Sequence, residues 1–144
     1  MEYYQVPTTD TNEPHYIQSK ELGKYVRTLL KQAFPAHKFS VTADRSTGSI
    51  DVILTDETLT TEAWATLRKE VTDAVGFLHG EGFDGSIDMR YSRKHYLLPS
   101  GEIIYAGTEG TKGSRGYVAA VHIPKPEHAK QLRLCSSFIR IARY

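Results

Sequence analysis

The stretch whose residues could most directly do chemistry is HGEGFDGSIDMRY, residues 79–91. It sets three carboxylates among three glycines, and clustered carboxylates can bind a metal ion or act together as an acid and a base. The calcium-loop pattern fails here, because Gly85 follows Asp84 and the next acid, Asp88, comes four residues later. Asp-Gly is also a strong turn dipeptide. We therefore interpret the stretch mainly as a turn, and an enzyme that uses Asp84, Asp88 or His79 ranks lowest among the functions considered.

A second candidate site is the glycine-rich segment GTEGTKGSRG, residues 107–116, which carries Lys112 and Arg115 between its glycines. Backbone N–H groups in such a loop can cradle a phosphate while the two cations neutralise it. The Walker ending Gly-Lys-[Ser/Thr] is absent, and we expect a strand rather than a helix to follow. A plain connection between strands is the interpretation that we favour. The alternative is a dimer or larger assembly that sequesters a phosphate-bearing nucleotide signal.

In RYSRKHY, residues 90–96, three cations alternate with Tyr91, Tyr96 and a histidine. This composition is typical of a patch that stacks on bases and binds phosphates, so nucleic-acid binding is an alternative function. It fits equally well the solvent-exposed face of a strand, which we favour. The chain has nine tyrosines, several of them at its ends or at turns. Exposed tyrosines are characteristic of protein-binding surfaces.

Other motifs of catalysis or metal binding are missing from the sequence. None of the six histidines forms H-E-x-x-H, and a single cysteine cannot supply the usual zinc ligands. The nucleophile motif G-x-S-x-G is also absent. Cys135 has no catalytic motif around it, and lone cysteines are usually small buried hydrophobic residues. The sequence therefore predicts no catalytic residue, metal or cofactor.

The charges of the chain nearly cancel, with 18 lysines and arginines against 17 aspartates and glutamates. No overall field favours a polyanion, nor does the chain mimic one. The first residues lack the basic start and apolar run of a secretion signal, and one cysteine cannot form an internal disulfide. No window reaches the roughly 18 consecutive apolar residues of a membrane span. We expect a cytoplasmic protein that does not bind membranes.

These candidate residues need elements to position them, and a chain of 144 residues predicts one domain. We expect an N-terminal arm over residues 1–18, a core domain over 19–123, and a C-terminal extension over 124–144. We expect the extension to contain a short helix from Glu127 to Leu132 and an edge strand.

Apolar residues at helical spacing predict one helix from Ser19, its expected N-cap, to the Phe34-Pro35 step. A second helix is predicted from Thr60 or Thr61 to Gly80. HKFSVTA and SIDVILT alternate as two strands of a hairpin, and KHYLLP, EIIYAG and GYVAAVHI indicate further strands. The fold expected is α+β, with two helices packed on one face of a mainly antiparallel sheet of about five strands. Ile53 is apolar on the outward face, which indicates a central or covered strand.

The run KELGKYVRTLLKQAFPAHKFSVTADRSTGSIDVILTD, followed after a helix by GFDGSIDM, resembles a known family. The family is the twenty-ninth of the large polyvalent protein-associated domains, and the likeness covers about residues 19–108. One departure is Glu57-Thr58, which stands where the family tends to have Gly-Pro. The resemblance implies a protein of a phage or conjugative element, encoded near activities that blunt host defences. It implies no catalytic residue.

The function that we expect is therefore binding rather than catalysis. The chain would be an accessory protein of a phage or mobile element that inhibits a host defence complex, such as a CRISPR effector. Loop cations and tyrosines form the predicted partner-binding surface: Arg90, Tyr91, Arg93, Lys112, Arg115 and Tyr117.

Overall fold

The structure is a computed structural model, and it describes residues 15–44, 48–55, 58–84, 89–108, 110–111, 118–134 and 138–143. For residues 83, 84, 89 and 90 it describes the backbone alone. The predicted arm up to residue 14 lies outside the described residues.

Helices and strands follow one another along the chain in this order: β1 (His15–Ile17), α1 (Ser19–Ala33), β2 (Phe39–Asp44), β3 (Ser49–Leu54), α2 (Thr61–Val75), the 3-10 helix η1 (Gly76–Leu78), β4 (Glu81–Asp84), β5 (Met89–Leu97), β6 (Ile103–Thr108), β7 (Val121–His122), β8 (Lys130–Leu134) and β9 (Phe138–Arg143).

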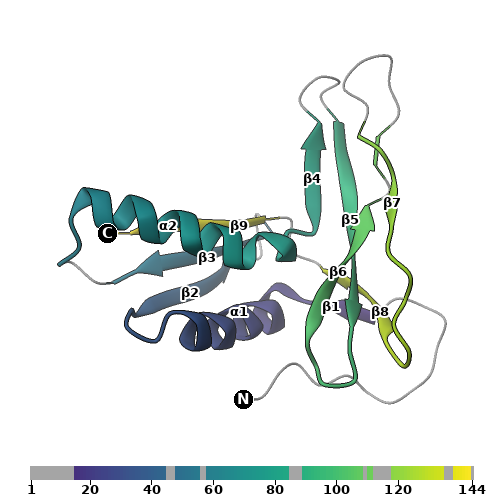
Figure 1. Ribbon diagram of the computed structural model, residues 1–144, viewed down its shortest axis with the longest axis horizontal. Helices are drawn as coiled ribbons and strands as arrows, with labels where there is room; N and C mark the ends of the chain where they lie inside the picture. Colours follow the sequence, from purple (N-terminus) through teal and green to yellow (C-terminus); the bar gives the residue numbers. More distant parts are fainter. Residues whose placement is uncertain are drawn as a thin grey trace.

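These strands form two sheets (Figure 1). One sheet has the order β2-β3-β9, and the other runs β1-β8-β5-β6-β7, with β4 paired to β5 outside that path. The pairs β1·β8 and β3·β9 are parallel, and the remaining pairs are antiparallel. The predicted α+β fold with two helices and mainly antiparallel pairing is confirmed, but both sheets are mixed.

Helix α1 begins at Ser19, which is its first helical residue, while Gln18 takes the N-cap position expected for Ser19. Leu22, Val26 and Leu30 lie buried on one side of the helix, as its apolar spacing predicts. The helix ends at Ala33, just before the Phe34-Pro35 step, because the residue before proline disfavours helical backbone angles.

Helix α2 begins with the predicted cap, since the Thr60 hydroxyl accepts a hydrogen bond of 3.1 Å from the Ala63 N–H. It ends earlier than the expected Gly80. Val75 is its last residue, and Gly76–Leu78 tighten into η1. The carbonyls of this last turn bond side chains of β5, and these bonds connect the end of the helix to the six-stranded sheet.

Both helices pack on the same face of the three-stranded sheet. The register aligns Val41 with Val52 and Val52 with Ile141, so these three side chains share one face. They belong to one buried cluster with the apolar residues of both helices. β3 is the central strand, which confirms one of the two explanations for the apolar outward residue Ile53.

Residues 124–144, predicted as an extension, supply β8 and β9. The helix expected over Glu127–Leu132 does not form: residues 127 and 128 make a turn, and β8 follows. The physical reason is the period of two in KQLRL, where Leu132 and Leu134 are buried while Gln131 and Arg133 are exposed. Within the described part of the chain, no helix has the length and apolar content that crossing a membrane would need.

One buried hydrogen bond ties α1 to the six-stranded sheet. The Tyr25 hydroxyl accepts from the Ile103 N–H at 2.9 Å, at the first residue of β6. Both residues are buried, so the bond lies away from water.

Replacing Tyr25 by phenylalanine should lower the free energy of unfolding by about 1–3 kcal/mol, because the buried Ile103 N–H would lose its acceptor. Urea denaturation followed by circular dichroism measures this change. Tyr16→Phe is the control, since the Tyr16 side chain is 56% exposed and its hydroxyl can reach water. If Tyr25→Phe and wild type were equally stable, the hydrogen bond would not hold the helix to the sheet.

Candidate functional site

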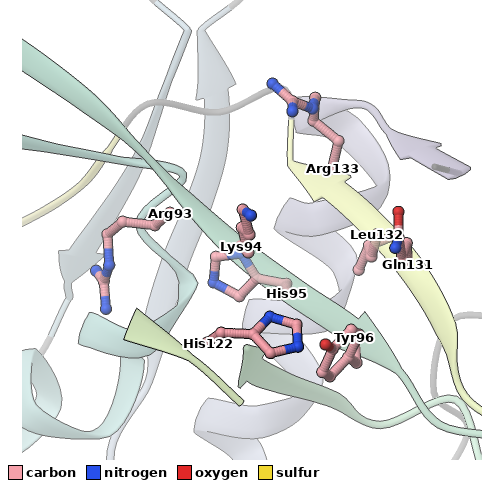
Figure 2. A pocket seen from close by; sticks show the side chains of 8 residues that line it. All are labelled: Arg93, Lys94, His95, Tyr96, His122, Gln131, Leu132 and Arg133. Carbon is pink, nitrogen blue, oxygen red and sulfur yellow. The ribbon is translucent and has the colours of Figure 1, made fainter. Parts of the chain in front are cut away.

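The six-stranded sheet carries a cleft of about 200 Å³ on the face turned away from the helices (Figure 2). Strands β5, β7 and β8 supply its lining, which contains no aspartate or glutamate: Arg93, Lys94, His95, Tyr96, His122, Gln131, Leu132 and Arg133.

Strand register brings four of the exposed side chains on this face into one line. Lys94 pairs with Gly107, which in turn pairs with His122 on β7. On the other side His95 pairs with Leu132, and the residues next to this pair, Lys94 and Arg133, both line the cleft. Arg133 pairs with Tyr16 on β1. We call Tyr16, Arg133, Lys94 and His122 the cationic row.

The cationic row is exposed and carries no acid of its own. All four side chains are exposed. Within the described residues, Lys94 and Arg133 have no acidic partner, and no hydrogen bond engages His122 or Gln131. The two cations are therefore available to an anion from outside the chain.

Gly107 leaves a gap in the row between Lys94 and His122. Its φ of +114° favours glycine, and a Cβ at this position would collide with the Val121 carbonyl oxygen. The close approach of β6 to β7 therefore requires glycine here. The fold thus keeps the space between the lysine and the histidine free of a side chain.

One wall of the cleft is fixed by Tyr96. Its hydroxyl donates to the Ile123 carbonyl at 2.6 Å. Its ring packs with Ala106 and Ala129 in a second, smaller apolar cluster. The chain after β7 is therefore held against the sheet beside the cationic row.

Arg93 points to the inner face of β5, opposite to Lys94, and its side chain lies apart from the other labelled side chains in Figure 2. Its guanidinium donates to the Gly76 carbonyl at 2.9 Å and stacks over the Tyr105 ring, 4.9 Å from the ring centre. A cation at the C-terminal end of a helix is stabilised by the partial negative charge of the unpaired carbonyls. Arg93 is thus engaged inside the chain.

His95 lies on the same inner face and is only 1% exposed. Its Nε2 bonds the Phe77 carbonyl, and because a carbonyl only accepts, Nε2 carries the proton. Nδ1 is buried without a hydrogen-bond partner. Burial lowers the pKa of His95 to about 4; the Phe77 carbonyl opposes this shift, and the nearby positive charge of Arg93 adds to it. The imidazole is therefore neutral at physiological pH.

His79, just after η1, has a lowered pKa for related reasons. Burial is the larger cause, and the charge of Arg93 is the second. The two inner histidines and Arg93 thus form one electrostatic group around the end of α2.

The structure describes only part of the predicted binding surface. Tyr91 is half-buried, and its ring covers Gly82, its partner on β4, where any larger residue would collide with it. Arg93 is turned inward. Arg90 is described by its backbone alone, and the other predicted residues lie outside the described residues: Lys112, Arg115 and Tyr117.

The carboxylates that first suggested chemistry are also only partly visible. Asp84 ends β4, its side chain is outside the description, and Asp88 lies outside the described residues. Among the residues that are described, no group of three or more His, Cys, Asp or Glu could hold a metal ion.

Sequence reasoning overlooked Lys94, His122, Arg133 and Tyr16 as a group. Lys94 lies within RYSRKHY, and the alternation of KQLRL could have placed Arg133 on an exposed face. Their alignment depends on pairing between strands that are distant in sequence, which no local pattern reveals.

A family model described as large polyvalent protein associated domain 29 matches residues 17–122, from the end of β1 to β7. The matched range includes Lys94 and His122, whereas Arg133 follows it. No curated protein and no solved structure matches the chain.

The lowered pKa of His95 predicts that acid destabilises the fold. The folded pKa is about 4 and the ordinary value is 6.5, so between these values the unfolded chain binds more protons at this site. The contribution of His95 to the free energy of unfolding should have its full value above pH 6.5 and should fall as the pH approaches 4. The loss from this group should reach roughly 3 kcal/mol.

Denaturant titration of wild type and His95→Gln on both sides of that pH window checks this expectation. Glutamine can still donate to the Phe77 carbonyl but does not titrate. His79 remains in both proteins, so the difference between the two pH dependences isolates His95. Equal losses of stability in acid would show that His95 is not the group responsible.

Removing the charge of Arg93 should raise the pKa of His79, since this charge is the second cause of its lowering. Arg93→Gln tests this, with His79 followed through its ring resonances by NMR. The matched control is Lys94→Gln, on the opposite face of β5, which should leave the His79 titration where it is. If His79 titrated in Arg93→Gln as it does in wild type, the charge of Arg93 would not be a cause of the lowered pKa of His79.

Proposed function

Because the chain belongs to the large polyvalent protein associated domain 29 family, we propose that it is a non-enzymatic accessory protein of a phage or other mobile element that acts by binding. Its partner is a host defence complex, such as a CRISPR effector, which the binding inhibits. The protein acts in the cytoplasm of the host cell. The observation that carries this proposal is the cationic row, an exposed line of two cations, a histidine and a tyrosine without acidic partners in the described chain.

Three properties of this face favour binding. Lys94 and Arg133 can pair with acids of a partner without first breaking ion pairs within the described part of their own chain. Tyr16 offers a large, stiff side chain of the kind enriched at protein interfaces. The row is also carried by paired strands, so its geometry is set before the partner arrives and little ordering has to occur on binding.

The row differs from the surface that the sequence first suggested. Arg93 is committed to the end of α2, so the neighbouring Lys94 takes its place on the outer face of β5. The partner patch that fits the row is acidic, because complementary charge speeds association and selects the partner. A near-neutral chain then depends on this local patch rather than on its overall charge.

Reversing two charges of the row should weaken capture of the defence complex. In Lys94→Glu with Arg133→Glu, glutamates would face the acidic patch, and affinity should fall by roughly tenfold to a hundredfold. The tagged protein is used to capture the complex from host lysate, and affinity for the purified complex is then measured together with inhibition of its activity.

The control carries the same two reversals on another surface. Arg68→Glu with Lys69→Glu changes exposed positions of α2 and should bind like wild type. Circular dichroism establishes that both variants are folded. Full capture and inhibition by the row variant would refute this binding surface.

A further inference from the structure

We propose that the cleft between Lys94, Arg133 and His122 binds a phosphate group, as a monoester or a diester. This inference names the ligand chemistry of the cationic row. It rests on the proposed function in taking this face as the binding surface, but it requires no protein partner.

The closeness of the two cations supports the proposal first. Lys94 and Arg133 each lie next to the paired residues His95 and Leu132 on neighbouring antiparallel strands, and both line the cleft. Like charges that face one another across a sheet repel and destabilise it. No acid in the described chain relieves this repulsion. A bound anion would, because it lets both cations contact the same group of oxygens.

The remaining donors suit an oxyanion. Arginine presents a fork of N–H groups that matches phosphate, and lysine adds a compact charge. His122 and the amide of Gln131 face the same cleft, and each can donate a hydrogen bond. Since the lining has no carboxylate, nothing in it repels a dianion.

The volume limits how much of a ligand the cleft encloses. About 200 Å³ is smaller than the roughly 300–1,000 Å³ of sites that enclose a whole organic ligand. It equals the volume of about six or seven waters. The cleft can therefore enclose a phosphate group and the atoms bonded to it, while any sugar and base of the ligand extend along the sheet outside the cleft. At the end of the row Tyr16 is exposed, and a base can stack on such a ring.

The source of the phosphate is a free nucleotide or a nucleic-acid strand. The phosphate-binding alternative in the sequence was the loop over residues 107–116, which begins at Gly107, the residue paired with both Lys94 and His122. The assignment made here uses Lys94, Arg133 and His122 in place of the loop cations.

Amide chemical shifts of the full chain, titrated with three probes, test the site. The probes are inorganic phosphate, adenosine monophosphate and a short single-stranded oligonucleotide without terminal phosphates. Phosphate or nucleotide should shift amides of β5, β7 and β8 around the cleft. Lys94→Gln with Arg133→Gln should weaken this binding about tenfold or more, the factor for losing a charged hydrogen bond. Arg68→Gln with Lys69→Gln on α2 should leave it unchanged.

The probes also separate the two sources. Tighter binding of the oligonucleotide than of the mononucleotide, falling steeply with salt, assigns the site to a nucleic-acid strand. Binding of the mononucleotide but not of the oligonucleotide assigns it to a free monoester. If no probe shifts the cleft amides, or if the row variant binds like wild type, the phosphate site is refuted.

Failure of this proposal is distinguishable from failure of the proposed function. Capture of a defence complex without binding of any phosphate probe would overturn the phosphate site alone. Phosphate binding that requires Lys94 and Arg133, in a protein that captures no defence complex, would support the phosphate site and reject the protein partner.

Discussion

A helix that ends inside a protein leaves carbonyl groups without N–H donors, and in this chain strand β5 supplies donors for the end of α2 and η1. The Arg93 guanidinium bonds the Gly76 carbonyl, and the His95 imidazole bonds the Phe77 carbonyl. Because β5 lies between β8 and β6, these two bonds attach the helical layer to the middle of the six-stranded sheet. Loss of the Arg93 or His95 donor would leave a carbonyl at the helix end without a hydrogen bond, and loss of the helix end would leave these two side chains without their acceptors.

Fixing one face of β5 determines what its other face presents. Arg93 and His95 point inward, so alternation along the strand sends Lys94 outward. β5 and β6 change register between Lys94 and His95, and such bulges re-aim side chains. The interior contacts thus set the direction of the cation that lies at the centre of the exposed row. Structure and proposed function therefore share one strand, with packing on one side and recognition on the other.

Local patterns in the sequence were sufficient for the helices and for the β2-β3 hairpin. Leu22, Val26 and Leu30 recur at helical spacing, which places all three on one face of the helix. The pattern fails at the end of β5, where His95 and Tyr96 are both buried, because the two faces of that strand are covered by different layers. Alternation then no longer shows which side meets water.

The candidate site was harder to predict for a second reason. The cationic row takes its members from four strands, and β8 and β1 pair in parallel across most of the chain length. Register between such distant segments is decided by packing of the whole sheet, and no local motif records it. The composition of RYSRKHY did indicate a cationic and aromatic patch, but only the pairing shows which of its cations is exposed.

The parallel pairing of β3 with β9 has a consequence for the order in which the protein is made. Asp51 on β3 and Arg140 on β9 form an ion pair at 3.0 Å across a separation of 89 residues. Until synthesis reaches residue 143, β3 has a neighbour on one side only and shows an open edge of N–H and C=O groups. Closing so distant a pair is slow compared with forming the hairpin. During synthesis the polypeptide therefore passes through a period in which the open edge of β3 can pair with other chains.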